Sequence, residues 1–384
     1  MVTLNSADNA LKTFYLEALT DTLDNKTNPF LAKIEKTSKN VSGKDIKMAV
    51  KVGYNNGISA GTEDGALPNA GSNRYVQYEA ELKNLYGTIE ISDKAIRASA
   101  NNEGAFVNLL NDEMQSLVKN ASYNFARMLF GSNDGKIAES LQIIGEKVTV
   151  DEICGFTEGM CVDVYSPDGE CLELCKVVAT VDDTDYTITF EDGVGNVTDD
   201  SLFYVHGSKG NEITGLASIF SNEDLYGLDR SHRIMRPYIN NTTGTLSDLV
   251  IQRAIDTIEK RSGSKINFIV CSWEVRRALM EYYKQNQTTI ATMELEGGFK
   301  ALSFNGIPVV VDRFCPTDTM YLLNTDDFKL CQLCDWQWLE AEDGKILKQV
   351  PGKAVYTATL VKYAELICQR PYGQGKLCGI EWDV

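Results

Sequence analysis

The ten cysteines are the residues of this chain whose type and spacing could most readily do chemistry. Cys331 and Cys334 form a CxxC pair, the spacing used in thiol-disulfide exchange and in zinc sites. A zinc site needs a second ligand pair, and Cys171 and Cys175 are distant in sequence with a different spacing. Because residues 328–336 have the pattern of a strand, we expect buried, unreactive thiols. A thiol-dependent redox enzyme is the alternative from another functional class.

Other catalytic signatures are sparse. The chain has two histidines, His206 and His232, and a lone histidine is more often structural than catalytic. The motifs HExxH and GxGxxG do not occur. Five acidic residues of a turn-rich stretch lack EF-hand spacing and are expected to face solvent rather than calcium: Asp182, Asp183, Asp185, Asp199 and Asp200. We therefore predict a protein that is not an enzyme and that holds no cofactor and no metal.

Composition sets the broad class. The 384 residues include 43% hydrophobic residues, enough for more than one core, and carry a formal net charge of −17. Lysines and arginines are scattered along the sequence, which argues against strong electrostatic binding to nucleic acid. Residues 1–43 lack a signal-peptide pattern, and no stretch approaches the roughly 20 apolar residues of a membrane span. We expect reduced thiols and no membrane contact, and the missing signal argues against a secreted β-rich binding module.

Residues 44–92 have the pattern of a long two-stranded ribbon. Apolar and polar residues alternate over residues 45–54 and again over residues 76–82, which is the period of a strand. The connection, residues 55–73, is rich in glycine and exceeds the roughly 2–5 residues of an ordinary hairpin loop. A lone ribbon is unstable in water, so its apolar face must pack on this chain's own core or on a neighbouring subunit. For a neighbouring subunit we predict these contact residues: Lys47, Lys51, Tyr54, Tyr78, Glu79 and Glu81.

The sequence after the ribbon changes character several times. At Leu85 the apolar phase shifts by one residue, which predicts a bulge or bend near Asn84. Residues 105–131 have helical spacing over about 40 Å at 1.5 Å per residue. Short strands separated by turns then predict an all-β insertion, and alternating helices and strands predict an α+β lobe. Residues 354–368 are apolar on both faces, which predicts a strand in the middle of a sheet.

The order of these segments resembles that of the major capsid proteins of tailed bacteriophages, whose fold is named for the Hong Kong 97 phage. Four stretches also resemble sequence segments of that family: YGTIEISDKA at 86–95, GNEITGL at 210–216, GFKALSFNGIPVVVD at 298–312 and YLLNTDDF at 321–328. The resemblance covers nearly the whole chain, and the shared order of the stretches carries it. It implies an α+β fold of the Hong Kong 97 type.

The resemblance also names the segments of the chain. They are an N-terminal arm (1–43), an extended hairpin loop (44–92), a peripheral domain with a spine helix (93–144), an all-β insertion (145–207), a connecting segment (208–245), an axial domain (246–325), and the peripheral-domain sheet with the C-terminus (326–384).

The resemblance implies a structural protein that self-assembles as pentamers and hexamers into an icosahedral virion capsid. Such a shell forms as a procapsid in the host bacterial cytoplasm and encloses double-stranded DNA without sequence-specific binding. The net negative charge of the chain agrees with a shell that does not bind DNA tightly.

Some members are cross-linked through a lysine at the hairpin tip, but residues 55–73 contain no lysine. About forty residues precede the ribbon, so we expect a separate scaffolding protein, with portal and decoration proteins as further candidate partners. The structural alternative is an encapsulin-like nanocompartment shell.

Overall fold

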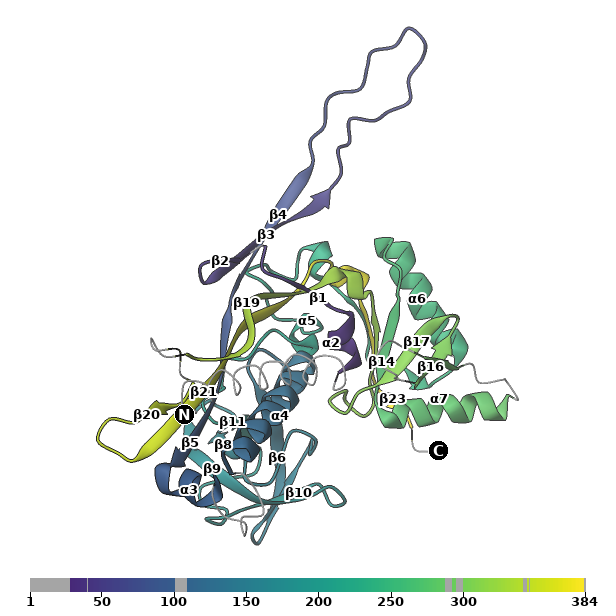
Figure 1. The fold of residues 1–384 in the computed structure, drawn as a ribbon. Coiled ribbons are helices and arrows are strands. Elements are labelled where there is room, and N and C mark those ends of the chain that lie inside the picture. Colours follow the sequence, from purple (N-terminus) through teal and green to yellow (C-terminus); the bar gives the residue numbers. More distant parts are fainter. Residues whose placement is uncertain are drawn as a thin grey trace.

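The computed structural model describes residues 28–39, 41–100, 109–286, 292–294, 300–340, 344 and 346–382. The architecture is α+β, as predicted. Figure 1 shows a ribbon and loop projecting from a body that consists of a sheet with a long helix, a small barrel and a mixed α/β lobe. Among the described residues, no helix is both long enough and apolar enough to cross a bilayer.

The projecting ribbon is formed by β3 (Asp45–Gly53) and β4 (Arg74–Glu81), which pair antiparallel, with β2 (Val41–Ser42) at the base of β3. The chain leaves this ribbon at Leu82 and continues as β5 (Lys83–Ser92), which belongs to a different sheet. The predicted break lies at Leu82 rather than at Asn84, which pairs regularly with Tyr363 within β5. The burial pattern shows the change of phase, because the sheet switch at Leu82 turns a new set of side chains inward.

The main sheet of the body has the strand order β1-β19-β21-β20, and β5 pairs with β21 as well. Its strands, apart from β5, are β1 (Glu35–Thr37), β19 (Phe328–Trp338), β20 (Lys348–Gln349) and β21 (Val355–Cys368). β21 has neighbours on both edges, so the prediction of a central final strand is confirmed.

The long helix α4 (Leu109–Phe130) packs against β5, after the shorter α3 (Asp93–Ala100). At 1.5 Å per residue its 22 residues make a rod of about 33 Å. It confirms the predicted helix for these residues, and residues 105–108 of that prediction lie outside the described residues. Before the ribbon, α2 (Pro29–Lys33) places Phe30 against the rings of Phe130 and Phe328, with centroid distances of 6.1 and 5.4 Å.

The β-rich insertion is a closed six-stranded barrel with its own apolar core. Its strands are β6 (Lys136–Ile144), β7 (Lys147–Val150), β8 (Cys161–Tyr165), β9 (Cys171–Asp182), β10 (Thr187–Phe190) and β11 (Leu202–Val205). The predicted range 145–207 leaves out β6. This strand follows α4 closely, and it belongs to the barrel because it pairs with both β7 and the distant β11.

The mixed lobe contains a seven-stranded sheet of order β12-β22-β18-β14-β17-β16-β15 and the helices α6 and α7, at the right of Figure 1. Its elements are α6 (Asp248–Ser262), α7 (Trp273–Gln285), β12 (Tyr238–Asn240), β14 (Phe268–Cys271), β15 (Thr292–Glu294), β16 (Lys300–Phe304), β17 (Ile307–Val311), β18 (Met320–Leu323) and β22 (Gly375–Leu377).

Two strands of this lobe fall outside the predicted axial range 246–325. β12 comes from the predicted connecting segment, and β22 comes from the C-terminal segment that was assigned to the peripheral sheet. Each is only three residues long, so neither shows a period of its own in the sequence. The remaining short elements are α5 (Leu216–Ile219), η1 (Arg233–Met235), β13 (Gly244–Thr245), η2 (Thr325–Asp327), η3 (Pro371–Gly373) and β23 (Ile380–Glu381).

Candidate interaction surface on the projecting ribbon

The base of the ribbon is fixed to the core of its own chain. Met48 and Tyr78 face each other across β3 and β4 and are 7% and 1% exposed. The Tyr78 hydroxyl donates a hydrogen bond to the carbonyl oxygen of Gln369 at 3.2 Å, and the backbone N–H of Glu79 donates to the carbonyl oxygen of Tyr226 at 3.1 Å. Tyr78, one of the predicted contact residues, therefore has no side-chain surface for a neighbour and is not kept as a contact.

The outer part of the ribbon and its loop is different, because large apolar side chains there are exposed to solvent. Their exposed fractions are Val52 40%, Tyr54 81%, Ile58 88%, Leu67 91% and Tyr75 61%. In Figure 1 this part of the chain extends well away from the body. Exposed apolar side chains gathered on one projection are typical of a surface that another molecule covers. Sequence reasoning named Tyr54 of this group but missed Ile58 and Leu67, because a loop has no period that would mark them.

The predicted charged contacts lie together at the solvent-facing side of the ribbon. Lys47 and Glu79 are direct cross-strand partners, and their charged groups are 3.4 Å apart. Lys44 and Glu81 make a second pair at 3.5 Å. The Lys51 ammonium lies 4.7 Å from the centroid of the Tyr54 ring. All four ion-paired side chains are more than half exposed, so these pairs contribute only about 0–1 kcal/mol each to folding and remain accessible to another molecule.

The loop is held at its neck by a close approach of its two arms. The side-chain oxygen of Asn55 accepts a hydrogen bond from the N–H of Gly57 at 2.8 Å, and that of Asn73 accepts one from the N–H of Asn55 at 3.1 Å. A Cβ atom on Gly71 would lie 2.4 Å from the Asn55 oxygen and 2.7 Å from the Gly57 nitrogen. Gly71 is therefore required for this approach. The sequence signal was the density of glycine and asparagine, but the pairing itself needed coordinates.

The CxxC residues lie on β19, as expected. Cys331 is completely buried, and burial raises the pKa of its thiol to about 11. Cys334 is partly buried on the same strand. A redox-active thiol needs a lowered pKa and access to substrate, so this environment disfavours thiol chemistry at Cys331.

Two of the other polar residues singled out in the sequence, His206 and Asp182, have structural roles. Nδ1 of His206 is 2.7 Å from Oδ1 of Asp163, whose carboxylate also accepts two backbone N–H groups of the barrel. Asp182 accepts the N–H of Thr184 in the turn between β9 and β10. Among the described residues, no group of three or more His, Cys, Asp or Glu side chains is arranged to hold a metal ion.

Ser59 lies in a Gly-x-Ser-x-Gly stretch, the sequence motif of the nucleophile elbow in serine hydrolases. The stretch belongs to the projecting loop and does not form the strand-to-helix turn that such an elbow requires.

With this geometry in view, comparisons with known proteins identify the fold. No model of a known protein family matches the chain. No curated protein matches its sequence. The chain is similar to a solved structure of the capsid asymmetric unit of cyanophage A-1(L), with 12% identity and a TM-score of 0.56 over 94% of this chain and 93% of that chain.

Two further solved structures are more distant. The capsid of an empty GTA particle is 9% identical, with a TM-score of 0.50 over 91% of this chain and 90% of that chain. The holo-SrpI encapsulin complex of Synechococcus elongatus PCC 7942 is 10% identical, with a TM-score of 0.45 over 93% of this chain and 89% of that chain, too remote to bear on function. The likeness to the cyanophage structure extends over almost the whole chain, so the chain has the Hong Kong 97-type capsid fold.

Proposed function

We propose that this chain is the major capsid protein of a tailed bacteriophage and that it assembles as pentamers and hexamers into an icosahedral shell around double-stranded DNA. The observation that carries this proposal is the projecting ribbon with its uncovered apolar side chains, on a chain with the Hong Kong 97-type fold. A projection that its own chain leaves exposed is stabilised when a neighbouring copy covers it. Many weak copies of one contact then give a strong shell.

The electrostatics of the chain support a container rather than a DNA-binding protein. The formal net charge is −17, which disfavours strong binding to the phosphate backbone. We propose that the shell encloses DNA and makes no sequence-specific contacts with it. We infer assembly in the host bacterial cytoplasm with a separate scaffolding protein, and portal and decoration proteins on the finished virion. No reaction is assigned to the chain, and no covalent cross-link at the loop, because residues 55–73 contain no lysine.

Electron microscopy of the purified protein, expressed alone and with a candidate scaffolding partner, tests the proposal. We expect closed shells, or rings of five and six subunits. A protein that stays monomeric under both conditions would overturn the capsid assignment. Closed shells that package an enzyme instead of DNA would favour the nanocompartment alternative.

The charged face of the ribbon can be tested by reversing Glu79 and Glu81 to lysine together. Because the broken pairs are exposed, we expect the folded monomer to lose no more than about 2 kcal/mol of stability, while shell formation falls at least tenfold. The measurement is the yield of shells by sedimentation, alongside the unfolding curve of the monomer.

A matched control separates contacts within the ribbon from contacts between subunits. The fourfold swap of Lys44 and Lys47 to glutamate with Glu79 and Glu81 to lysine restores both ion pairs but inverts the charge pattern. If the charges face another subunit, the swapped protein still assembles poorly. Normal assembly of the swapped protein would show that only the pairs within the ribbon matter.

A further inference from the structure

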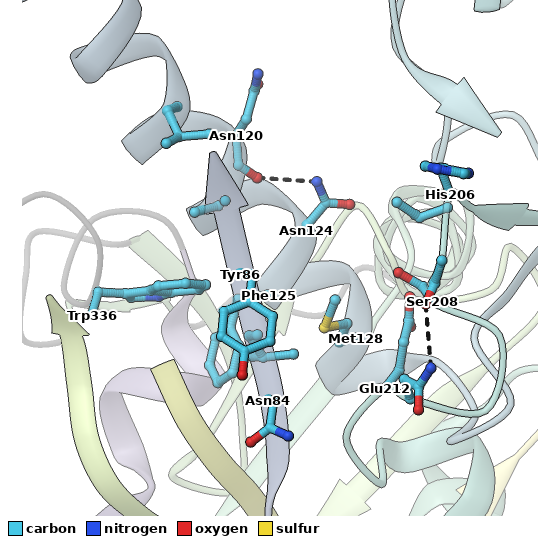
Figure 2. A pocket seen from close by; sticks show the side chains of 17 residues that line it. Asn84, Tyr86, Asn120, Asn124, Phe125, Met128, His206, Ser208, Glu212 and Trp336 are labelled. Carbon is cyan, nitrogen blue, oxygen red and sulfur yellow. Dashed lines mark hydrogen bonds between the residues drawn. The ribbon is translucent and has the colours of Figure 1, made fainter. Parts of the chain in front are cut away.

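A cavity of about 270 Å³ lies beside the long helix, where α4 and β5 meet the segment that follows the barrel. Figure 2 shows Phe125 and Met128 of α4, Tyr86 of β5, and Glu212 around this space. It is separate from the projecting loop and plays no part in the proposed function. Much of its wall is apolar, but two polar groups on it are incompletely satisfied.

Both unsatisfied atoms are buried hydrogen-bond acceptors. Glu212 is 1% exposed; its Oε1 pairs with the guanidinium of Arg127, while its Oε2 has no hydrogen-bond partner among the described residues. The side-chain oxygen of Asn124 is also buried and has no such partner. Its orientation is fixed, because the Asn124 amide nitrogen donates to the carbonyl oxygen of Asn120 at 3.2 Å. A buried acceptor without a partner has lost the hydrogen bonds that it makes in water, so a ligand that donates to both atoms is stabilised by them.

The charge around Glu212 selects the kind of donor. Burial raises the pKa of the Glu212 carboxyl, although the neighbouring Arg127 acts in the opposite direction. One guanidinium therefore does not fully compensate the buried carboxylate, and an additional positive group would stabilise it. An ammonium group supplies three donors and one positive charge.

The apolar part of the wall indicates which chemical group is attached to the ammonium. Leu117, Phe125 and Met128 line the cavity and give it apolar surface, which suits an aliphatic stem. A hard metal cation takes six or more oxygens, and no group of three or more His, Cys, Asp or Glu side chains among the described residues is arranged to hold a metal ion here. We propose that this cavity binds a primary alkylammonium group, with its nitrogen between Glu212 and Asn124 and its stem along α4. The group is carried either by a free aliphatic amine or by a lysine side chain of a second copy of the chain.

Calorimetric titration of the purified full chain with n-butylammonium, and with n-butanol as the neutral control of the same shape, tests the site. We expect the amine to bind at least tenfold more tightly than the alcohol. Equal binding of the two, or no binding of the amine, would overturn the proposal.

Substitutions at Asn124 locate the binding without touching the buried ion pair. N124L removes an acceptor and should weaken amine binding at least fivefold, whereas N124D adds a negative charge and should strengthen it by a similar factor. Because Asn124 is only partly buried on α4, both variants should remain folded, which circular dichroism checks. Amine affinity unchanged in both folded variants would place the binding elsewhere and refute the site.

Sedimentation of the chain with and without the amine distinguishes the two sources. If a lysine of a second copy fills the cavity, the amine competes and reduces self-association. If the natural ligand is a free amine, self-association is unchanged while binding persists. Both results support an ammonium site, and neither depends on whether the assembled particle is a virion shell.

Discussion

At the scale of single residues, one buried lysine and two partly exposed charged residues link strands of the main sheet. Lys362 lies in the middle of β21 with none of its surface exposed, and its ammonium pairs with the carboxylate of Asp335 on β19. Lys36 of β1 reaches the other oxygen of the same carboxylate at 3.0 Å. One aspartate thus links three strands. Burial alone would raise the pKa of Asp335, but the two ammonium groups lower it to about 2.

Replacing Asp335 with asparagine should destabilise the fold, because the buried ammonium of Lys362 then loses its ion pair with the Asp335 carboxylate. We expect the free energy of unfolding to fall by about 2 kcal/mol, less than for a fully buried pair because Asp335 is 35% exposed and solvent screens its charge, measured by urea denaturation. The double variant D335N/K362M, which removes the buried charge as well, should recover to within about 1 kcal/mol of the parent. A single variant as stable as the parent would contradict this role for Asp335.

Glu365 makes the stability of the fold depend on pH. The side chain is buried in β21, where its oxygen accepts N–H groups from Thr214 and Leu366, and burial raises its pKa from 4.5 to about 7. A raised carboxyl pKa contributes stability that is complete below pH 4.5 and is lost as pH rises to about 7. We expect this contribution to be roughly 3 kcal/mol. Asp312, with its pKa raised by burial to about 6, acts in the same direction.

The variant E365Q isolates this effect, since a glutamine oxygen can accept the same two N–H groups without ionising. We expect the free energy of unfolding of E365Q to change less between pH 5 and pH 8 than that of the parent, when both are followed by chemical denaturation. Parallel pH profiles for the two proteins would show that Glu365 does not titrate in this range.

At the scale of elements, the ribbon combines an anchored base with an exposed end. The base shares a core cluster with α4, β19 and β21, whereas the loop makes its own neck from Asn55, Gly57, Gly71 and Asn73. Changes in the loop should therefore affect contacts with other molecules more than the stability of the chain itself.

Gly71 tests this separation. A Cβ in G71A would clash with the side-chain oxygen of Asn55 and the backbone of Gly57, so the neck must open. We expect the free energy of unfolding of the monomer to change by less than about 0.5 kcal/mol, because Gly71 is only partly buried and lies in the projecting loop away from the core, while shell yield falls severalfold. G61A in the same loop is the control, since nothing lies within 4 Å of its added Cβ. Equal shell yields for the two variants would argue against a role for the neck.

At the scale of the whole molecule, the chain is organised around several apolar clusters, and the barrel has one to itself. The two ends of the barrel segment also meet: the N–H of Gly210 donates to the carbonyl oxygen of Asp134 at 2.7 Å, and the Tyr204 hydroxyl donates to the Asp134 carboxylate at 2.9 Å. A closed sheet with adjacent ends has the features of an independent folding unit.

The fragment 134–210 should therefore fold on its own. We expect dispersed amide resonances and a cooperative thermal transition by circular dichroism. V162D, which places a charge in the barrel core, is the negative control, because Val162 is fully buried there. A fragment that is as unstructured as this control would show that the barrel depends on the rest of the chain.

The sequence by itself determined the elements whose periodicity is local. Alternation over residues 44–92 predicted the ribbon, helical spacing predicted α4, and apolar residues on both faces predicted the central position of β21. The strand pattern around Cys331 also predicted its burial. These inferences succeed because a buried face imposes its period on the residues that form it.

Only the tertiary structure decided which distant residues meet. It buried Tyr78 against the chain's own core, placed β6 in the barrel, and gave β12 and β22 to the seven-stranded sheet. It also brought Asn124 and Glu212 to one cavity, each with an acceptor left over. Such outcomes depend on pairings between segments far apart in sequence, whose energies are set by the partner and are therefore absent from the local pattern of either segment.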